Sequence, residues 1–256
     1  MNKVIPILAA CAGAILLTQA AHAQHHGHHP QGAQHQKPHA SGEVRMDGAF
    51  RAMVHKQDYG PKVSLGALIK GGATEAVGAV EGLRGEITAI DGTFIVSYGK
   101  PCTTCPEVAQ EDATLLASAR VEQWLPPLAL PSDLAGAALD EYIVAQARTA
   151  GLNVERAFPV RMRGDLTDVK MHIIAAPNPE FAGHGSDHGM ADQQEIAAER
   201  IAGEVVGFYA PPAAQGVITH PGEPFHFHWV DMARTRTAHL DAFGMAKGAQ
   251  LYLPRP

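Results

Sequence analysis

The segment from residue 224 to residue 230 constrains the fold more than any other part of the chain. It reads Pro-Phe-His-Phe-His-Trp-Val, so aromatic residues and histidines alternate along it. Side chains two positions apart in a β-strand point to the same face of a sheet. We therefore expect a strand whose aromatic side chains face the core, while His226 and His228 project together from the opposite face.

A third histidine, His239, follows in the stretch Thr-Ala-His-Leu-Asp at 237–241. The gap before it suits a hairpin that returns antiparallel, which would place His239 across from the pair. Three converging imidazoles that leave open positions for water or substrate are typical of catalytic rather than structural zinc sites. The alternative is three partly buried histidines that only form hydrogen bonds. Asp241 is either a partner of a ligand imidazole or a solvated carboxylate.

Strand-like segments dominate the rest of the chain. Residues 86–90 alternate, Asp91-Gly92 is a strong two-residue hairpin turn, and residues 93–98 continue as a second strand. We expect an α+β fold of two sheet-containing lobes with short helices, approximately residues 48–150 and 151–256. The other expected strands are 115–125, 157–162, 169–175, 205–209 and 237–243, and the expected helices are 65–69, 134–150 and 193–201.

Residues 1–23 have the pattern of a secretory signal peptide. Lys3 gives a positive start, an apolar stretch follows over residues 4–17, and Ala-His-Ala at 21–23 is a cleavage site. Processing before Cys11, as in a lipoprotein, is the alternative. The protein is therefore expected to be exported, to the periplasm. No later segment approaches the roughly 20 apolar residues that a membrane span requires.

Residues 24–47 are expected to be a disordered, histidine-rich segment, because they contain almost nothing to bury. The segment either gathers Zn²⁺, Cu²⁺ or Ni²⁺ through its imidazoles or is a solvated spacer. Cys102 and Cys105 are expected to form a local disulfide, with metal handling or redox chemistry as alternatives. His184, Asp187 and His188, in a glycine-rich loop, form either a surface metal site or a mobile polar loop.

Three collinear motifs, spread over about residues 63–254, resemble the α-acetolactate decarboxylase family. The stretch Gly-Glu-Val-Val-Gly-Phe-Tyr-Ala-Pro at 203–211, together with the three histidines, resembles the C-terminal motif of that family. Residues 78–94 resemble its Gly-Glu to Asp-Gly hairpin, and residues 158–166 resemble its arginine-containing strand. The spaced histidines are the most specific part of the resemblance.

The resemblance implies a two-lobed α+β enzyme with Zn²⁺, or another divalent transition metal, held between the lobes by His226, His228 and His239. It implies that 2-acetolactate is converted to acetoin and CO₂. It also places Glu86 and Arg161 at active-site positions. Arg161 would pair with the substrate carboxylate, since a guanidinium matches its planar shape, and Glu86 would carry the proton that fixes product stereochemistry.

A non-catalytic periplasmic metal-binding or metal-buffering protein of the same fold is the alternative. It is favoured by the histidine-rich segment, and by Gly-Ala-Val at 78–80 where the family commonly has a threonine. The expected partner in either case is small, a keto-hydroxy acid or a metal ion. The formal net charge of −6 argues against a nucleic-acid partner. The sequence leaves open whether the protein is a homodimer.

Overall fold

The computed structural model describes residues 42–181 and 189–256. The signal peptide, the histidine tract and the cluster of His184, Asp187 and His188 lie outside the described residues, so these expectations stay predictions. Strand β1 (Val44–Asp47) begins before Gly48, within the segment expected to be disordered, because it pairs with strand β6 and packs Val44 and Met46 against the core. Within the described residues, no helix is long and apolar enough to cross a membrane.

The N-terminal sheet is antiparallel and has strand order β1-β6-β3-β4-β5, with the short strand β2 paired to β6. The predicted hairpin is confirmed, since Asp91 and Gly92 form its turn with φ of 51° and 78°. The remaining strands of this sheet are β2 (Val63–Ser64), β3 (Glu75–Val80), β4 (Gly85–Ile90), β5 (Thr93–Tyr98) and β6 (Asp112–Ala119).

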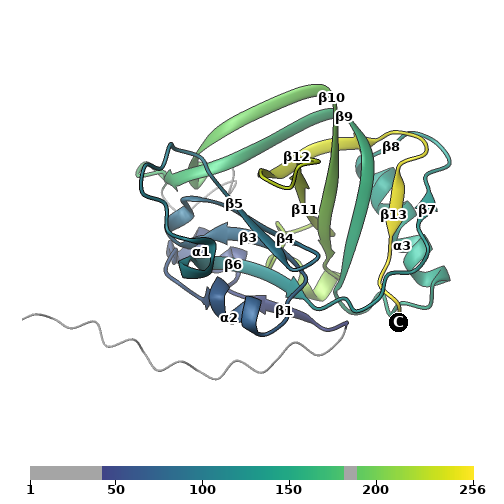
Figure 1. Cartoon of the computed structure of the whole chain (residues 1–256), viewed down its shortest axis with the longest axis horizontal. Coiled ribbons are helices and arrows are strands. Elements are labelled where there is room, and N and C mark those ends of the chain that lie inside the picture. The colour runs from purple at the N-terminus through teal and green to yellow at the C-terminus, as the bar shows by residue number, and fades with distance from the viewer. Residues whose placement is uncertain (1–41, 182–188) are drawn as a thin grey trace, which may run out of the picture. The chain divides into compact units, whose positions relative to one another are not determined.

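The C-terminal sheet has strand order β7-β13-β9-β10-β11-β12-β8, and an additional pairing joins β9 to β12. Strands β9 and β10 form the longest antiparallel pair among the described residues (Figure 1). The sheet consists of β7 (Leu128–Ala129), β8 (Leu134–Ala135), β9 (Phe158–Pro177), β10 (Ala191–Tyr209), β11 (Phe225–Val230), β12 (Thr237–Met245) and β13 (Gln250–Tyr252).

One secondary-structure expectation for this sheet was wrong, since residues 193–201 form part of strand β10 instead of a helix. The strands expected at 157–162 and 169–175 are confirmed as parts of the single strand β9. The stretch at 193–201 is rich in helix-forming Gln, Glu and Ala. Each such residue favours a helix by only a few tenths of a kcal/mol, roughly, so pairing along the whole of β9 decides the outcome.

The helices are short, and each packs its buried side chains into one of the hydrophobic cores. Helix α1 spans Phe50–Lys56, α2 spans Leu65–Lys70 and α3 spans Gly136–Thr149. Helix α3 buries Leu139, Ile143 and Ala147, which recur every four residues and therefore form one face of the helix. The fold is thus mostly β, with two sheets and few helices, and the expected helices near residues 65–69 and 134–150 are confirmed.

The two faces of strand β11 face different surroundings. Phe225, Phe227 and Trp229 lie in a core formed within the C-terminal part of the chain, as their alternation predicts. Val230 lies on the other face, in a second core that also contains Ile90 and Ile95 of the N-terminal sheet. The histidines of β11 therefore face the N-terminal sheet.

Candidate functional site

His226, His228 and His239 converge in the structure, and we call them the histidine cluster. His226 and His228 lie on β11, and His228 is paired directly with His239 on β12. One nitrogen of each ring lies within 4.8 Å of the others, so the three residues could hold a metal ion. The Nε2 atom of His226 is 3.1 Å from Nε2 of His228 and 3.1 Å from Nδ1 of His239. Tetrahedral zinc with nitrogen ligands at 2.0–2.1 Å implies nitrogen separations of about 3.3 Å.

The protonation of the histidine cluster also fits a cation. The backbone carbonyl of Ile218 can only accept, so Nδ1 of His226, 2.6 Å away, must donate to it. Burial, and then the charge of His220, lower the pKa of His226 to about 3, so the ring is neutral and Nε2 is a bare lone pair. Burial likewise lowers the pKa of His228 and His239, and neutral imidazole is the form that binds metals.

Glu86 on β4 lies across from the histidine cluster. Its Oε2 is 3.6 Å from Nε2 of His228, and its Oε1 accepts a 3.2 Å hydrogen bond from the backbone N–H of Ile174. Burial raises the pKa of Glu86 to about 7, although His172 and the Ile174 N–H oppose the shift. The structure therefore brings Glu86, which the family resemblance placed at an active-site position, and the three histidines together.

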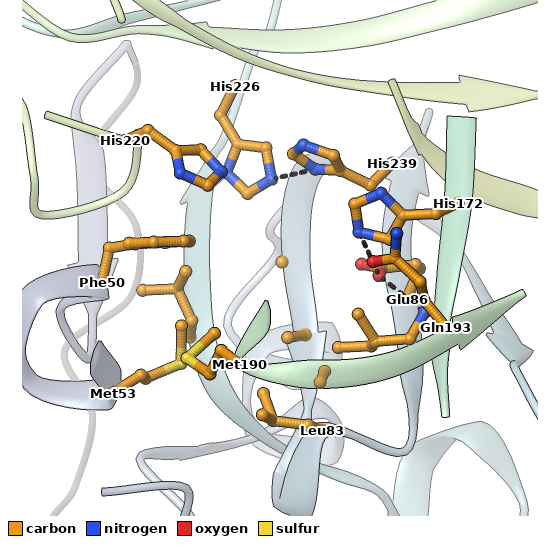
Figure 2. A pocket seen from close by; sticks show the side chains of 15 residues that line it. Phe50, Met53, Leu83, Glu86, His172, Met190, Gln193, His220, His226 and His239 are labelled. Atoms are coloured by element: carbon orange, nitrogen blue, oxygen red, sulfur yellow. Dashed lines mark hydrogen bonds and ion pairs between the residues drawn. The ribbon is translucent and has the colours of Figure 1, made fainter. Parts of the chain in front are cut away.

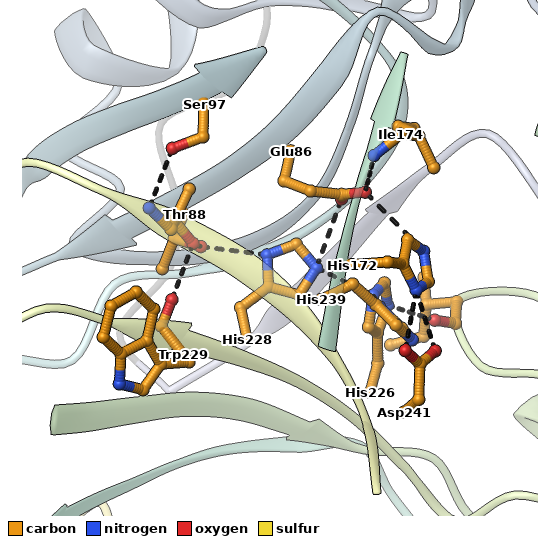
Figure 3. Close-up of polar contacts among 12 residues, drawn as sticks. Glu86, Thr88, Ser97, His172, Ile174, His226, His228, Trp229, His239 and Asp241 are labelled. Atoms are coloured by element: carbon orange, nitrogen blue, oxygen red, sulfur yellow. Dashed lines mark hydrogen bonds and ion pairs between the residues drawn. The ribbon is translucent and has the colours of Figure 1, made fainter. Parts of the chain in front are cut away.

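His172 on β9 belongs to the same group, and sequence reasoning did not single it out. It is paired with His239 across β12, its Nε2 is 3.9 Å from Oε1 of Glu86, and its Nδ1 donates to Asp241 at 2.8 Å. Burial lowers the pKa of His172, but the hydrogen bond to Asp241 and the charge of Glu86 outweigh it, so the net shift is upward. Asp241 thus forms hydrogen bonds with His172 (Figure 3). Among the described contacts, none joins Asp241 to the three residues of the histidine cluster.

A small cavity of about 60 Å³ lies beside the histidine cluster and Glu86. One side is polar and the other is apolar, and Met53 and Met190 lie on the apolar side (Figure 2). Gly78 and Ala79, where the family commonly has a threonine, also line the cavity. Its polar wall consists of Glu86, His172, Gln193, His220, His226 and His239. Such a space suits a small organic molecule that carries a few oxygen atoms.

Arg161 lies elsewhere. Its guanidinium donates to Glu75 at 2.5 Å and to Asp91 at 2.8 Å, and it stacks over the ring of Trp124. Arg234 contacts Asp91 as well, and also Glu204. We call Arg161, Arg234, Glu75, Asp91 and Glu204 the arginine cluster. Among the described residues that line the cavity, none belongs to this cluster.

The remaining sequence candidates lie outside the cavity. Cys102 and Cys105 are joined in a disulfide, as expected, within the exposed segment between β5 and β6. Neither cysteine lines the cavity in the part of the chain that the structure describes. The pair therefore closes a local turn and contributes nothing to the group of histidines.

Comparison with known proteins places this geometry in context. A family model described as alpha-acetolactate decarboxylase matches residues 46–253. The solved structure of alpha-acetolactate decarboxylase from Bacillus subtilis strain 168 is similar, with a TM-score of 0.67 and 13% sequence identity, over 84% of this chain and 86% of that chain. Among curated proteins, none matches the sequence significantly.

A second solved structure shows the same likeness. It is a protein of unknown function from Staphylococcus aureus, described as similar to alpha-acetolactate decarboxylase. It aligns with a TM-score of 0.60 and 16% identity, over 82% of this chain and 84% of that chain. At these identities the structural likeness shows the fold, and the match over residues 46–253 shows the family.

Proposed function

The chain belongs to the α-acetolactate decarboxylase family, whose members are carboxy-lyases, and we propose on this basis that it converts 2-acetolactate to acetoin and CO₂. We further propose that His226, His228 and His239 hold Zn²⁺ or another divalent transition metal beside the cavity. The observation that carries the proposal is the convergence of three neutral imidazoles beside one buried carboxylate, Glu86, next to a small cavity that Glu86, His226 and His239 line.

The metal, when bound, would act as a Lewis acid toward the oxygen atoms of a keto-hydroxy acid. The chain itself supplies the surroundings of the reaction. Phe50, Met53 and Met190 form part of the apolar wall, which excludes water from the substrate. In such surroundings, charged groups interact more strongly than in water, and the loss of a carboxylate as neutral CO₂ is favoured.

Glu86 is the proposed proton carrier. Loss of CO₂ leaves an electron pair on the substrate carbon, and that carbon must take up one proton to form acetoin. Glu86 borders both the cavity and the histidine cluster, and the N–H of Ile174 fixes one of its oxygens. A carboxyl group held on one side of the substrate delivers its proton to one face, which fixes the stereochemistry of the product.

Arg161 is not used to contact substrate in this proposal. The sequence made it the candidate partner of the substrate carboxylate, but its guanidinium contacts Glu75 and Asp91. Freeing it would leave the buried Glu75 without its cation, which is costly, whereas Asp91 would keep its contact with Arg234. We propose instead that Arg161 holds the N-terminal sheet to the C-terminal sheet.

The experiment that tests the function measures acetoin formed from racemic 2-acetolactate by purified protein loaded with Zn²⁺. The wild type is compared with His226→Ala, and the metal content of both proteins is measured in parallel. Turnover by the wild type, and its loss together with the metal in the variant, is the expected result. Tight binding of one metal ion per chain without any formation of acetoin would overturn the proposed decarboxylase activity.

That negative result would favour the second candidate, a non-catalytic metal-binding protein of the same fold. One observation already points toward it, because Gly78 and Ala79 place no hydroxyl group in the cavity wall. The two candidates also differ in their response to ligands. An enzyme should bind a keto-hydroxy acid in competition with substrate, whereas a metal-buffering protein should show no specific binding of such an acid.

A further inference from the structure

We propose that Thr88 and Thr237 are positioning residues that fix the His228 ring so that its Nε2 atom faces the other two histidines. The hydroxyl of Thr88 is 2.9 Å from Nδ1 of His228 (Figure 3). It is also 2.5 Å from the hydroxyl of Thr237. Thr88 lies on β4 of the N-terminal sheet, whereas Thr237 and His228 lie on strands of the C-terminal sheet. The inference rests on the proposed metal centre and names side chains that would prepare it.

The direction of each hydrogen bond follows from the contact between the Thr237 hydroxyl and a backbone carbonyl, because a carbonyl can only accept. The hydroxyl of Thr237 donates to the backbone carbonyl of Trp229 at 3.0 Å, and a hydroxyl has only one proton to give. Thr237 must therefore accept from Thr88. Thr88 has then used its own proton, so it must accept from Nδ1 of His228. A neutral imidazole that is protonated on Nδ1 carries its lone pair on Nε2, the atom that faces the cluster.

Burial makes these contacts consequential. Thr88, Thr237 and His228 are each 0% exposed, so bulk water does not reach them to replace a lost partner. The backbone N–H of Thr237 also donates to the hydroxyl of Ser97 on β5, at 2.9 Å. The N-terminal sheet thus contacts Thr237 through Thr88 and Ser97, and contacts the ring of His228 through Thr88. It therefore orients His228 from outside the histidine cluster.

His226 shows why His228 is the sensitive ligand. The tautomer of His226 is set by the backbone carbonyl of Ile218, which no side-chain substitution removes. His228 also has a backbone hydrogen bond, to Ile87. Loss of the threonine hydroxyl should therefore weaken the metal site without abolishing it. Partners of this kind typically change metal affinity by 10–100-fold, and we expect about tenfold here.

The test compares Thr88→Val with Thr88→Ser and with Thr114→Val. Valine keeps the shape of threonine but cannot accept from Nδ1, whereas serine keeps the hydroxyl. Thr114 is also a buried threonine, and its hydroxyl contacts only the backbone carbonyl of Asp58 among the contacts described. Zn²⁺ affinity is measured by competition with a chelating dye, Co²⁺ coordination by visible absorption, and folding by melting of the metal-free protein.

Thr88→Val should lower Zn²⁺ affinity about tenfold and change the Co²⁺ spectrum, and Thr88→Ser should restore both. Thr237→Val removes the next hydroxyl, so it should act in the same direction and gives a second reading if Thr88→Val does not fold. Wild-type affinity in both valine variants, or an equal loss in Thr114→Val, would overturn the proposal. A wild-type protein that binds Zn²⁺ tightly but forms no acetoin would overturn the reaction and leave this inference standing.

Discussion

The histidine cluster and the arginine cluster begin from equivalent positions in the same sheet. Val206 on β10 is paired with His228 on one side and with Arg161 on the other, so both side chains project toward the N-terminal sheet. They lie two strands apart, about 10 Å at the usual strand spacing. What differs is the segment of the N-terminal sheet that each one meets.

Across from His228 lie a hydroxyl, Thr88, and a carboxylate, Glu86, and a cavity opens beside them. Across from Arg161 lie two carboxylates, Glu75 and Asp91, which engage the guanidinium directly. The first arrangement leaves nitrogen lone pairs available for a ligand, whereas the second neutralises its charge internally. The opposing sheet therefore decides whether a polar side chain stays available to a ligand or is engaged within the protein.

The strongest test of this contrast removes one member of the histidine cluster. His239→Ala should abolish stoichiometric binding of Zn²⁺ and lower decarboxylation on the order of 10³-fold, since two imidazoles hold a metal poorly. Metal content and initial rates of acetoin formation measure the effect. His55→Ala, an exposed histidine on α1, is the matched control and should behave as wild type. Full activity in His239→Ala would show that the cluster is not the metal centre.

The next largest effect is expected in the arginine cluster, and on stability instead of activity. Arg161→Met leaves Glu75 buried without its cation, so the free energy of unfolding should fall by about 3 kcal/mol. Urea unfolding of the metal-free protein gives this value. The folded fraction should keep its Zn²⁺ affinity and its KM. If this variant had normal stability but a KM raised tenfold, Arg161 would have to contact the substrate after all.

Glu86→Gln separates the carboxylate from the metal ligands. We expect turnover to fall by about 100-fold, because the amide cannot deliver a proton, while Zn²⁺ binding persists. Stopped assays for acetoin and a metal titration on the same sample measure the two quantities. Glu107→Gln, at an exposed carboxylate, serves as the control. An unchanged rate in Glu86→Gln would require another proton carrier in the cavity.

The smallest expected effect is a change in how stability depends on pH. Burial raises the pKa of Glu75 from 4.5 to about 7 although Arg161 opposes the shift, so the folded state binds more protons than the unfolded state between these values. The free energy of unfolding should therefore fall as pH rises from about 4.5 to about 7. Glu75→Gln should remove on the order of 1 kcal/mol of that fall, measured by urea unfolding at pH 5 and pH 7.5. An identical pH dependence in both proteins would contradict it.

Local patterns predicted the parts of the molecule that depend on neighbouring residues. Alternation along 225–230 gave the strand and its two faces, and Asp91-Gly92 gave the hairpin turn. The prediction of a helix at 193–201 was wrong. The composition of this segment favours a helix, but the segment pairs with strand β9 instead. Composition describes only the chain segment itself, so it contains no information about that partner.

The same limit applies to the candidate site. The three histidines could be predicted because they belong to one hairpin with a readable spacing. Thr88 and His172 could not, since a lone threonine or histidine in a strand has no pattern that distinguishes it from a core residue. Arg161 was predicted at the substrate because its own strand resembles the family, but Glu75 and Asp91, which engage it, come from strand β3 and from the turn between β4 and β5.

The distribution of the site along the chain has a consequence for how the protein folds. His226 and His239 are only 13 residues apart, whereas Thr88 and His228 are 140 residues apart. The entropy of closing a loop grows with the logarithm of its length, so the longer closure costs about 2 kcal/mol more. The hairpin that carries the histidines can therefore assemble early, while the contacts to Glu86 and Thr88 form only when the distant parts of the chain have come together. On the proposed function, a nascent chain would thus acquire its affinity for metal before it acquires its capacity for catalysis.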